Sequence, residues 1–160
     1  MAVYFMAMDS NDGKILWYVQ KLGRASLAEI GAAAGLSVSA ANERLKKLEK
    51  QGAITGWTAR VDPEAAGCPV LAFVYVLIER PEHEPAFLAM VQDEAAIQEC
   101  HHVASEWSYL LKVRAASLLA LEDIVARRIK VLPGIPRSQT IIVLSSAKET
   151  AALPISASVP

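Results

Sequence analysis

The stretch GLSVSAANERLKKLEKQGAITGWTAR, residues 35–60, decides the fold of the first part of this chain. Its apolar residues recur at spacings of three and four, which is the period of one face of an α-helix. The residues that we expect to face a core are Val38, Ala41, Leu45 and Leu48. Ser37 is a suitable N-cap for this helix and Gly52 a suitable end. The β-forming residues from 54 to 61 predict a short strand, or wing, after it.

The other side of the predicted helix is polar and carries residue types that read DNA bases. Asparagine pairs with adenine, glutamate accepts from cytosine, and lysine suits guanine or phosphate. Arg44 flanks this side, and the pattern leaves open whether it grips phosphate or braces the fold. The candidate DNA contacts are Ser37, Ser39, Asn42, Glu43, Arg44, Lys46 and Lys50. An ordinary solvated helix face has a similar composition, so this helix alone does not establish DNA binding.

Two shorter helices are predicted before this one. The first begins at Asp9 or Ser10 and runs to Leu22, and Gly23 ends it. The second opens with the capping box SLAE, residues 26–29, and Gly35 stops it. We expect their buried faces to consist of Ile15, Leu16, Val19 and Leu22 in the first and of Leu27, Ile30 and Ala34 in the second. A capped helix, a glycine turn and a second capped helix form a helix-turn-helix, which is a DNA-binding motif.

The periodicity changes after residues 62–69, DPEAAGCP, whose prolines and glycine mark a domain boundary. The elements predicted beyond it are a strand at 70–79, a helix at 84–93, strands at 97–104 and 107–114 joined tightly at Ser105 and Glu106, a helix capped by Ser117, and a strand at 137–145. This βαββαβ order is ferredoxin-like. The buried stripe of the second helix is expected to be Leu118, Leu121, Val125 and Ile129.

These elements predict an α+β chain with two domains. A winged helix-turn-helix domain occupies residues 1–61, with 1–7 as a loose extension; a linker follows at 62–69, a ferredoxin-like domain at 70–146 and a tail at 147–160. The first strand of the second domain is apolar on both faces. The two helices of a βαββαβ unit cover only one face of its sheet, and a large apolar face is rarely left in water. We therefore predict a homodimer in which a second copy covers the other face.

Composition narrows the classes of protein. Of the 160 residues, 53% are hydrophobic, which supports real cores and argues against disorder. Net charge is +3 over residues 1–61 and −4 over residues 62–160, so only the first part is expected to meet phosphate. The two cysteines suit a reducing compartment. The start lacks the features of a signal peptide, and the longest apolar run, 70–78, is too short to span a bilayer. We expect a soluble cytoplasmic protein that does not bind membranes.

Two patterns in the second domain suggest chemistry that their spacing does not support. Cys100, His101 and His102 are all zinc-ligating types, but neighbours on a strand point to opposite faces and do not converge. The same histidines with Ser105 or Ser108 lack an aligned acid and an oxyanion hole. We therefore predict no catalytic residues, no metal site and no cofactor, and hence not an enzyme.

Four segments of this chain resemble the Lrp/AsnC, or feast/famine, family of transcriptional regulators. They are MDSNDGKIL at 8–16, the stretch at 35–60, ECHHVASEWSYLLKVR at 99–114 and LPGIPRSQTIIVL at 132–144. The resemblance implies a helix-turn-helix domain followed by a ferredoxin-like, RAM/ACT-like domain. It also implies that the second domain dimerises, assembles further to octamers, and binds amino acids where dimers meet.

The segment Ala104–Ser108, ASEWS, departs from the family pattern, which is close to Thr-Gly-Asp-aromatic-Asp. Ser105 replaces the glycine, Glu106 the first acid and Ser108 the last. A serine offers an α-ammonium group only a neutral hydrogen bond, whereas a carboxylate offers a charge-assisted one. Glu106 can substitute for the missing acid if its longer side chain reaches the ligand. The effector residues that the resemblance implies are Ala104, Ser105, Glu106, Trp107, Ser108, Tyr109, Gly134 and Ile135. Effector identity, and whether an effector binds, stay open.

The sequence thus predicts a sequence-specific, DNA-binding transcriptional regulator that is modulated by an amino acid or a related small metabolite. Its partners are double-stranded DNA, further copies of the chain as a dimer or octamer, and an amino-acid-like effector. Two alternatives stay open. One is an architectural DNA-binding protein with low sequence preference, and the other is an effector sensor that acts through a protein partner.

Overall fold

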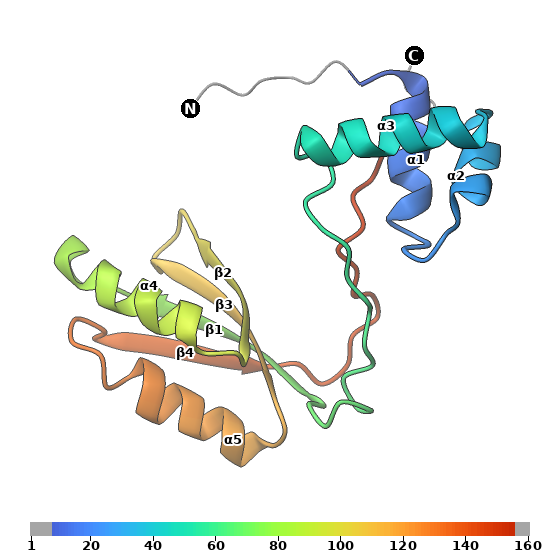
Figure 1. The fold of residues 1–160 in the computed structure, drawn as a ribbon. Coiled ribbons are helices and arrows are strands. Elements are labelled where there is room, and N and C mark those ends of the chain that lie inside the picture. The colour runs from blue at the N-terminus through green and yellow to red at the C-terminus, as the bar shows by residue number, and fades with distance from the viewer. Residues whose placement is uncertain (1–7, 156–160) are drawn as a thin grey trace. The chain divides into compact units, whose positions relative to one another are not determined.

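In the computed structural model, the described residues are 8–155, so the predicted loose extension at 1–7 lies outside them. The described part divides into two compact units (Figure 1). Of the described residues, the helical unit comprises 8–60 together with 149–155, and the sheet unit comprises Val61–Lys148. Residues 62–69 belong to the sheet unit, and the tail from Glu149 packs with the helices.

The helical unit contains α1 (Ser10–Val19), α2 (Leu27–Ala34) and α3 (Val38–Lys50). Capping boxes at Asp9 and Ser26 satisfy the first backbone N–H groups of α1 and α2. Gly35 takes the left-handed conformation, with φ of 72°, and lets the chain turn directly into α3. The core of the unit consists of Ile15, Leu16, Val19, Ile30, Ala34, Ala41 and Leu48.

Three local predictions for this unit are wrong. Helix α1 ends at Val19 rather than Leu22, and Leu22 lies in the following turn with 53% of its surface exposed. Val38 is 51% exposed because it begins α3, before the helix lies over the core. No strand forms over 54–61 in the described chain, where this segment has no backbone neighbour to pair with.

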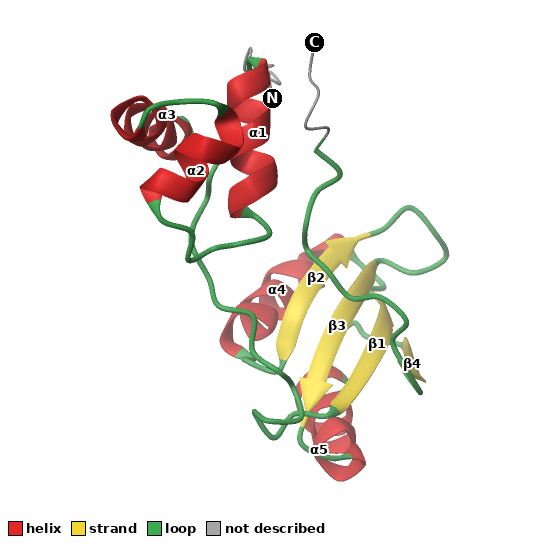
Figure 2. Ribbon diagram, turned by 90° about the vertical axis from the view of Figure 1, so that its right-hand side faces the viewer, coloured by secondary structure: helices red, strands yellow, loops and turns green. Residues whose placement is uncertain are grey.

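The sheet unit has the predicted βαββαβ order and is ferredoxin-like. Its elements are β1 (Val70–Leu77), a short 3₁₀ helix η1 (Pro81–His83), α4 (Glu84–Asp93), β2 (Ile97–His102), β3 (Tyr109–Ala115), α5 (Leu118–Asp123) with a π-helical continuation η2 (Ile124–Ile129), and β4 (Arg137–Ile142). The strands form one antiparallel sheet in the order β2-β3-β1-β4. Helices α4 and α5 lie on the same side of it (Figure 2).

The two faces of the sheet differ in burial. Ala72, Val74 and Val76 of β1 face the helices and are fully buried. Phe73 and Tyr75 alternate with them on the open face and are half-buried in the single chain. Most of the stripe predicted for the second helix is buried, but Leu118 is 58% exposed because it is the first residue of α5.

The predicted connection between the middle strands is wrong in length. Strand β2 ends at His102 and β3 begins at Tyr109, so residues 103–108 form a loop instead of a tight turn at Ser105 and Glu106. The loop closes where the Val103 N–H donates to the Ser108 carbonyl oxygen at 3.0 Å. The predicted strands at 70–79 and 137–145 are also shorter, ending at Leu77 and Ile142.

Candidate DNA interface and ligand site

The polar face of α3 is open to solvent. Ser39, Glu43, Lys46 and Lys50 are exposed and Asn42 is half-buried, so the helix brings the candidate base-reading side chains to one side. Apart from a 3.3 Å contact between the hydroxyls of Ser37 and Ser39, none of these residues has a side-chain hydrogen bond or ion pair within residues 8–155. Their donors and acceptors are therefore available to a ligand of the helix.

Ser37 and Arg44 have structural partners. The Ser37 hydroxyl accepts from the Ala40 N–H at 3.2 Å and caps α3. Arg44 Nη1 donates to Asp9 Oδ2 at 2.6 Å and to Asp12 Oδ1 at 2.8 Å, which joins α3 to the start of α1. The backbone N–H of Asp12 and the Arg44 guanidinium lower the pKa of Asp9, and the two carboxylates raise the pKa of Arg44. These contacts favour a structural role for Arg44, which braces α3 against α1, over a contact with DNA phosphate.

Trp57 is a feature of this unit that sequence reasoning missed. Its indole Nε1 donates to Glu49 Oε1 at 2.9 Å and ties the extended segment back to the last turn of α3. The contact spans an irregular turn, where no periodic pattern links the two residues. It holds the segment around Trp57 beside the end of the candidate reading helix.

Among the predicted effector residues of the 103–108 loop, Ser105 and Glu106 lie around Trp107. This side chain is buried, lies 5.8 Å from the Tyr75 ring and has the Arg137 guanidinium 4.3 Å above its centroid. Arg137 Nη2 also binds Glu106 Oε2 at 3.2 Å. The Ser105 hydroxyl accepts from the Trp107 N–H at 3.0 Å and bends the loop. The carboxylate that was expected to substitute for the missing acid is therefore paired with Arg137.

Ser108 and Tyr109 face other partners. The Ser108 hydroxyl accepts from the Ile78 N–H at 3.0 Å and extends the contact between the loop and β1. Tyr109 points to the helix side, where its hydroxyl donates to Glu84 Oε1 at 3.2 Å. Burial raises the pKa of Tyr109, and the nearby Glu84 adds to this effect. Trp107 and Tyr109 thus do not line a common wall.

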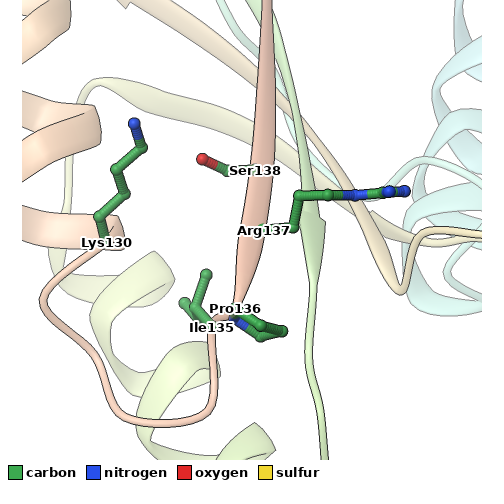
Figure 3. A pocket seen from close by; sticks show the side chains of 5 residues that line it. All are labelled: Lys130, Ile135, Pro136, Arg137 and Ser138. Atoms are coloured by element: carbon green, nitrogen blue, oxygen red, sulfur yellow. The ribbon is translucent and has the colours of Figure 1, made fainter.

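Gly134 and Ile135 lie beside a separate hollow. Gly134 has φ of 77°, and a Cβ atom there would collide with the His83 ring. Ile135 lines an open hollow of about 410 Å³ together with Lys130, Pro136, Arg137 and Ser138. Figure 3 shows Lys130 and Ser138 on one side of β4, while the Arg137 side chain points away toward the other. The Ser138 hydroxyl is buried and has no hydrogen-bond partner in the described chain.

The side chains of Cys100, His101 and His102 do not converge on a common site. His101 pairs with Glu99 on the open face of the sheet, whereas His102 stacks on Tyr109 at a ring distance of 5.0 Å. Among the described residues, no group of three or more His, Cys, Asp or Glu side chains is placed to hold a metal ion. No helix in residues 8–155 has both the length and the apolar character needed to cross a membrane.

Models of known protein families match both units of the chain. Residues 8–55 match the winged helix-turn-helix DNA-binding family model, and residues 71–153 match the Lrp/AsnC ligand binding domain. The chain is 36% identical over 146 residues to the leucine-responsive regulatory protein of Haemophilus influenzae, covering 90% of this chain and 88% of that protein. It is 38% identical over 139 residues to the HTH-type transcriptional regulator LrpA of Mycobacterium tuberculosis, covering 85% and 90%.

Solved structures of related proteins have a similar fold to this chain. The complex of transcriptional regulator NMB0573 from Neisseria meningitidis with L-Met has a TM-score of 0.88 and 29% identity, covering 92% of this chain and 96% of that one. Escherichia coli AsnC has a TM-score of 0.82 and 25% identity, covering 90% and 97%. The chain therefore belongs to the Lrp/AsnC family of transcriptional regulators, with a helix-turn-helix for DNA and a ligand-binding domain.

Proposed function

We propose that α3 reads a specific DNA sequence through Ser39, Asn42, Glu43, Lys46 and Lys50. The observation that carries this proposal is the polar face of α3, which is largely exposed and whose side chains have, among the described residues, only the contact between the Ser37 and Ser39 hydroxyls. Ser37 and Arg44 support the reading helix, by capping it and by bracing it against α1. In a dimer, two such helices would enter successive major-groove faces about one helical turn apart.

The test is a charge reversal on this face. Lys46→Glu combined with Lys50→Glu should abolish binding to an operator fragment and leave the oligomer unchanged, because both positions are exposed. Arg80→Glu combined with Arg127→Glu makes the same change of charge at exposed positions of the sheet unit and should retain binding. Competition by unrelated DNA at fixed salt then measures specificity, and equal competition would indicate an architectural binder instead. Retained binding by the Lys46 and Lys50 variant would refute the assignment.

We also propose that an amino acid or a related small metabolite binds the sheet unit and modulates DNA binding. Support comes from the L-Met complex of the Neisseria neighbour, together with the hollow at Ile135. The protein acts in the cytoplasm as a binding protein rather than an enzyme, and it assembles as a dimer and then an octamer through the sheet unit.

The effector proposal is tested by thermal shift with a panel of amino acids. Because the Ser108 hydroxyl is engaged with Ile78, Ser108→Asp keeps one oxygen for that N–H and offers a second to an α-ammonium group. We expect this change to create or enlarge the shift, while Ser145→Asp, at an exposed position, should not. The absence of any shift for either protein across the panel would end this proposal.

A further inference from the structure

The last described residues of the chain pack against the helical unit. Gln20, the C-cap of α1, pairs with the backbone of Leu153: its Nε2 donates to the Leu153 carbonyl oxygen and its Oε1 accepts from the Leu153 N–H, each at 2.9 Å. Ile155 packs against the core of the unit. Two bonds from one side chain to one residue select a single register of the tail, although 133 positions separate the partners.

The tail returns to the helical unit beside the point where the chain leaves it. Arg60, the last residue before the sheet unit, donates from Nη2 to the Glu149 carbonyl oxygen at 3.1 Å. At the other end, β1 and β4 are paired neighbours, and the Val143 N–H donates to the Leu71 carbonyl oxygen at 2.9 Å. The connectors at 61–69 and 143–148 therefore join the helical unit at two residues in contact, Arg60 and Glu149, and join the sheet unit at two paired strands, β1 and β4.

We infer that residues 149–155 are a strap of the helical unit, through which the sheet unit holds the DNA-reading helix by two connectors instead of one. One flexible connector leaves an attached unit free to rotate, whereas a second attachment removes much of that conformational freedom. A shift of β1 or β4, caused by a ligand or by assembly, then acts on both connectors at once. The effect on DNA rests on the proposed function; docking of the strap does not.

The test releases the strap in the full-length protein. Gln20→Met removes both hydrogen bonds to Leu153 but keeps the length of the side chain. The matched control is Gln92→Met, which changes an exposed glutamine of α4. A chain truncated after Lys148 removes the strap completely. We expect faster amide hydrogen exchange at Leu153 in the Gln20 variant only. Operator affinity should fall about tenfold in the truncated chain, which loses the second attachment completely, and by a smaller factor in the Gln20 variant, which loses only two hydrogen bonds of the strap. The oligomer should stay unchanged by light scattering.

The two proposals fail in different ways. A wild-type protein that binds no DNA contradicts the proposed function alone, and the exchange of Leu153 then decides whether the strap docks. An unprotected Leu153 N–H in the wild type would overturn the inference. So would wild-type DNA affinity in both the Gln20→Met variant and the truncated chain.

Discussion

At the scale of single residues, the ion pair between Asp12 and Arg44 joins α1 to α3 and stabilises the helical unit. Asp12 is the buried charged residue of the described chain, with 3% of its surface exposed, and its carboxylate accepts from Arg44 on α3. A buried carboxylate that loses its partner suffers the full cost of desolvation. Arg44, which sequence reasoning placed among the DNA contacts, thus stabilises the unit that presents those contacts.

Arg44→Met should therefore lower the free energy of unfolding of the helical unit by about 1–3 kcal/mol. Lys47→Met, which removes an exposed charge from the same helix, should have little effect. Urea denaturation of the two variants makes the comparison. Equal stability would show that Arg44 does not act as a brace.

The pH dependence of this contact follows from Asp9. Its pKa is lowered from the ordinary 3.8, first by the Asp12 N–H and then by Arg44. A group whose pKa is lower when folded stabilises the fold above its unfolded pKa, and this contribution is lost as the pH falls through the folded pKa. Asp9→Asn keeps a good N-cap but removes the charge. We expect wild type to be more stable than this variant at neutral pH, and the difference to shrink below pH 3.8. A difference that stays constant with pH would contradict this account.

At the scale of elements, the turn between α2 and α3 sets the geometry of the helix-turn-helix. Gly35 has φ of 72°, and open space surrounds the position that a Cβ atom would take. A substitution there meets backbone strain rather than a steric clash with neighbours. The turn thus depends on glycine for its dihedral angle alone.

Gly35→Ala should destabilise the helical unit by about 1–2 kcal/mol through this strain. Gly56→Ala is the matched control, because Gly56 also has open space but no positive φ. Thermal unfolding followed by circular dichroism should show a lower Tm for the first variant only. Equal unfolding temperatures for the two variants would contradict this prediction and would show that the turn can change its backbone conformation to avoid the strain.

At the scale of the whole molecule, the open face of the sheet is the surface through which we propose that two copies of the chain assemble. Phe73 and Tyr75 lie side by side with residues of β3 and β4 on this face, away from both helices. Residues that remain half-buried in one chain gain further burial when a second copy covers the sheet, which is the driving force for the proposed dimer.

Phe73→Lys should convert the proposed dimer to monomers, since a charge would have to be buried against the partner's sheet. Leu119→Lys, at a position of α5 that is already 69% exposed, should leave the assembly intact. Light scattering at micromolar concentration distinguishes the outcomes. A Phe73→Lys protein that keeps the wild-type mass would place the interface elsewhere.

Local patterns in the sequence were enough to predict the helix starts, the βαββαβ order and the polar face of α3. Caps such as Ser26 and Ser37 act on backbone groups within three residues, and periodicity reflects neighbours along one element, so a local pattern carries this information. The same patterns were wrong at Leu22, Val38 and Leu118, which lie at or beyond an element's end, because the period says nothing about where the core stops.

Contacts between groups that are distant in the sequence depend on the tertiary structure and could not be predicted from local patterns. The pairing of Glu106 with Arg137 and the docking of Leu153 on Gln20 join residues whose separation along the chain leaves no periodic signal. Trp107 and Tyr109 are only two positions apart, yet they face different partners because Trp107 lies in the loop before β3. Each contact depends on the registers of several strands and helices at once, and such registers are set by packing of the complete core. The stretch at 35–60 thus encodes the candidate reading helix, while the contacts made by distant residues such as Leu153 come from the rest of the fold.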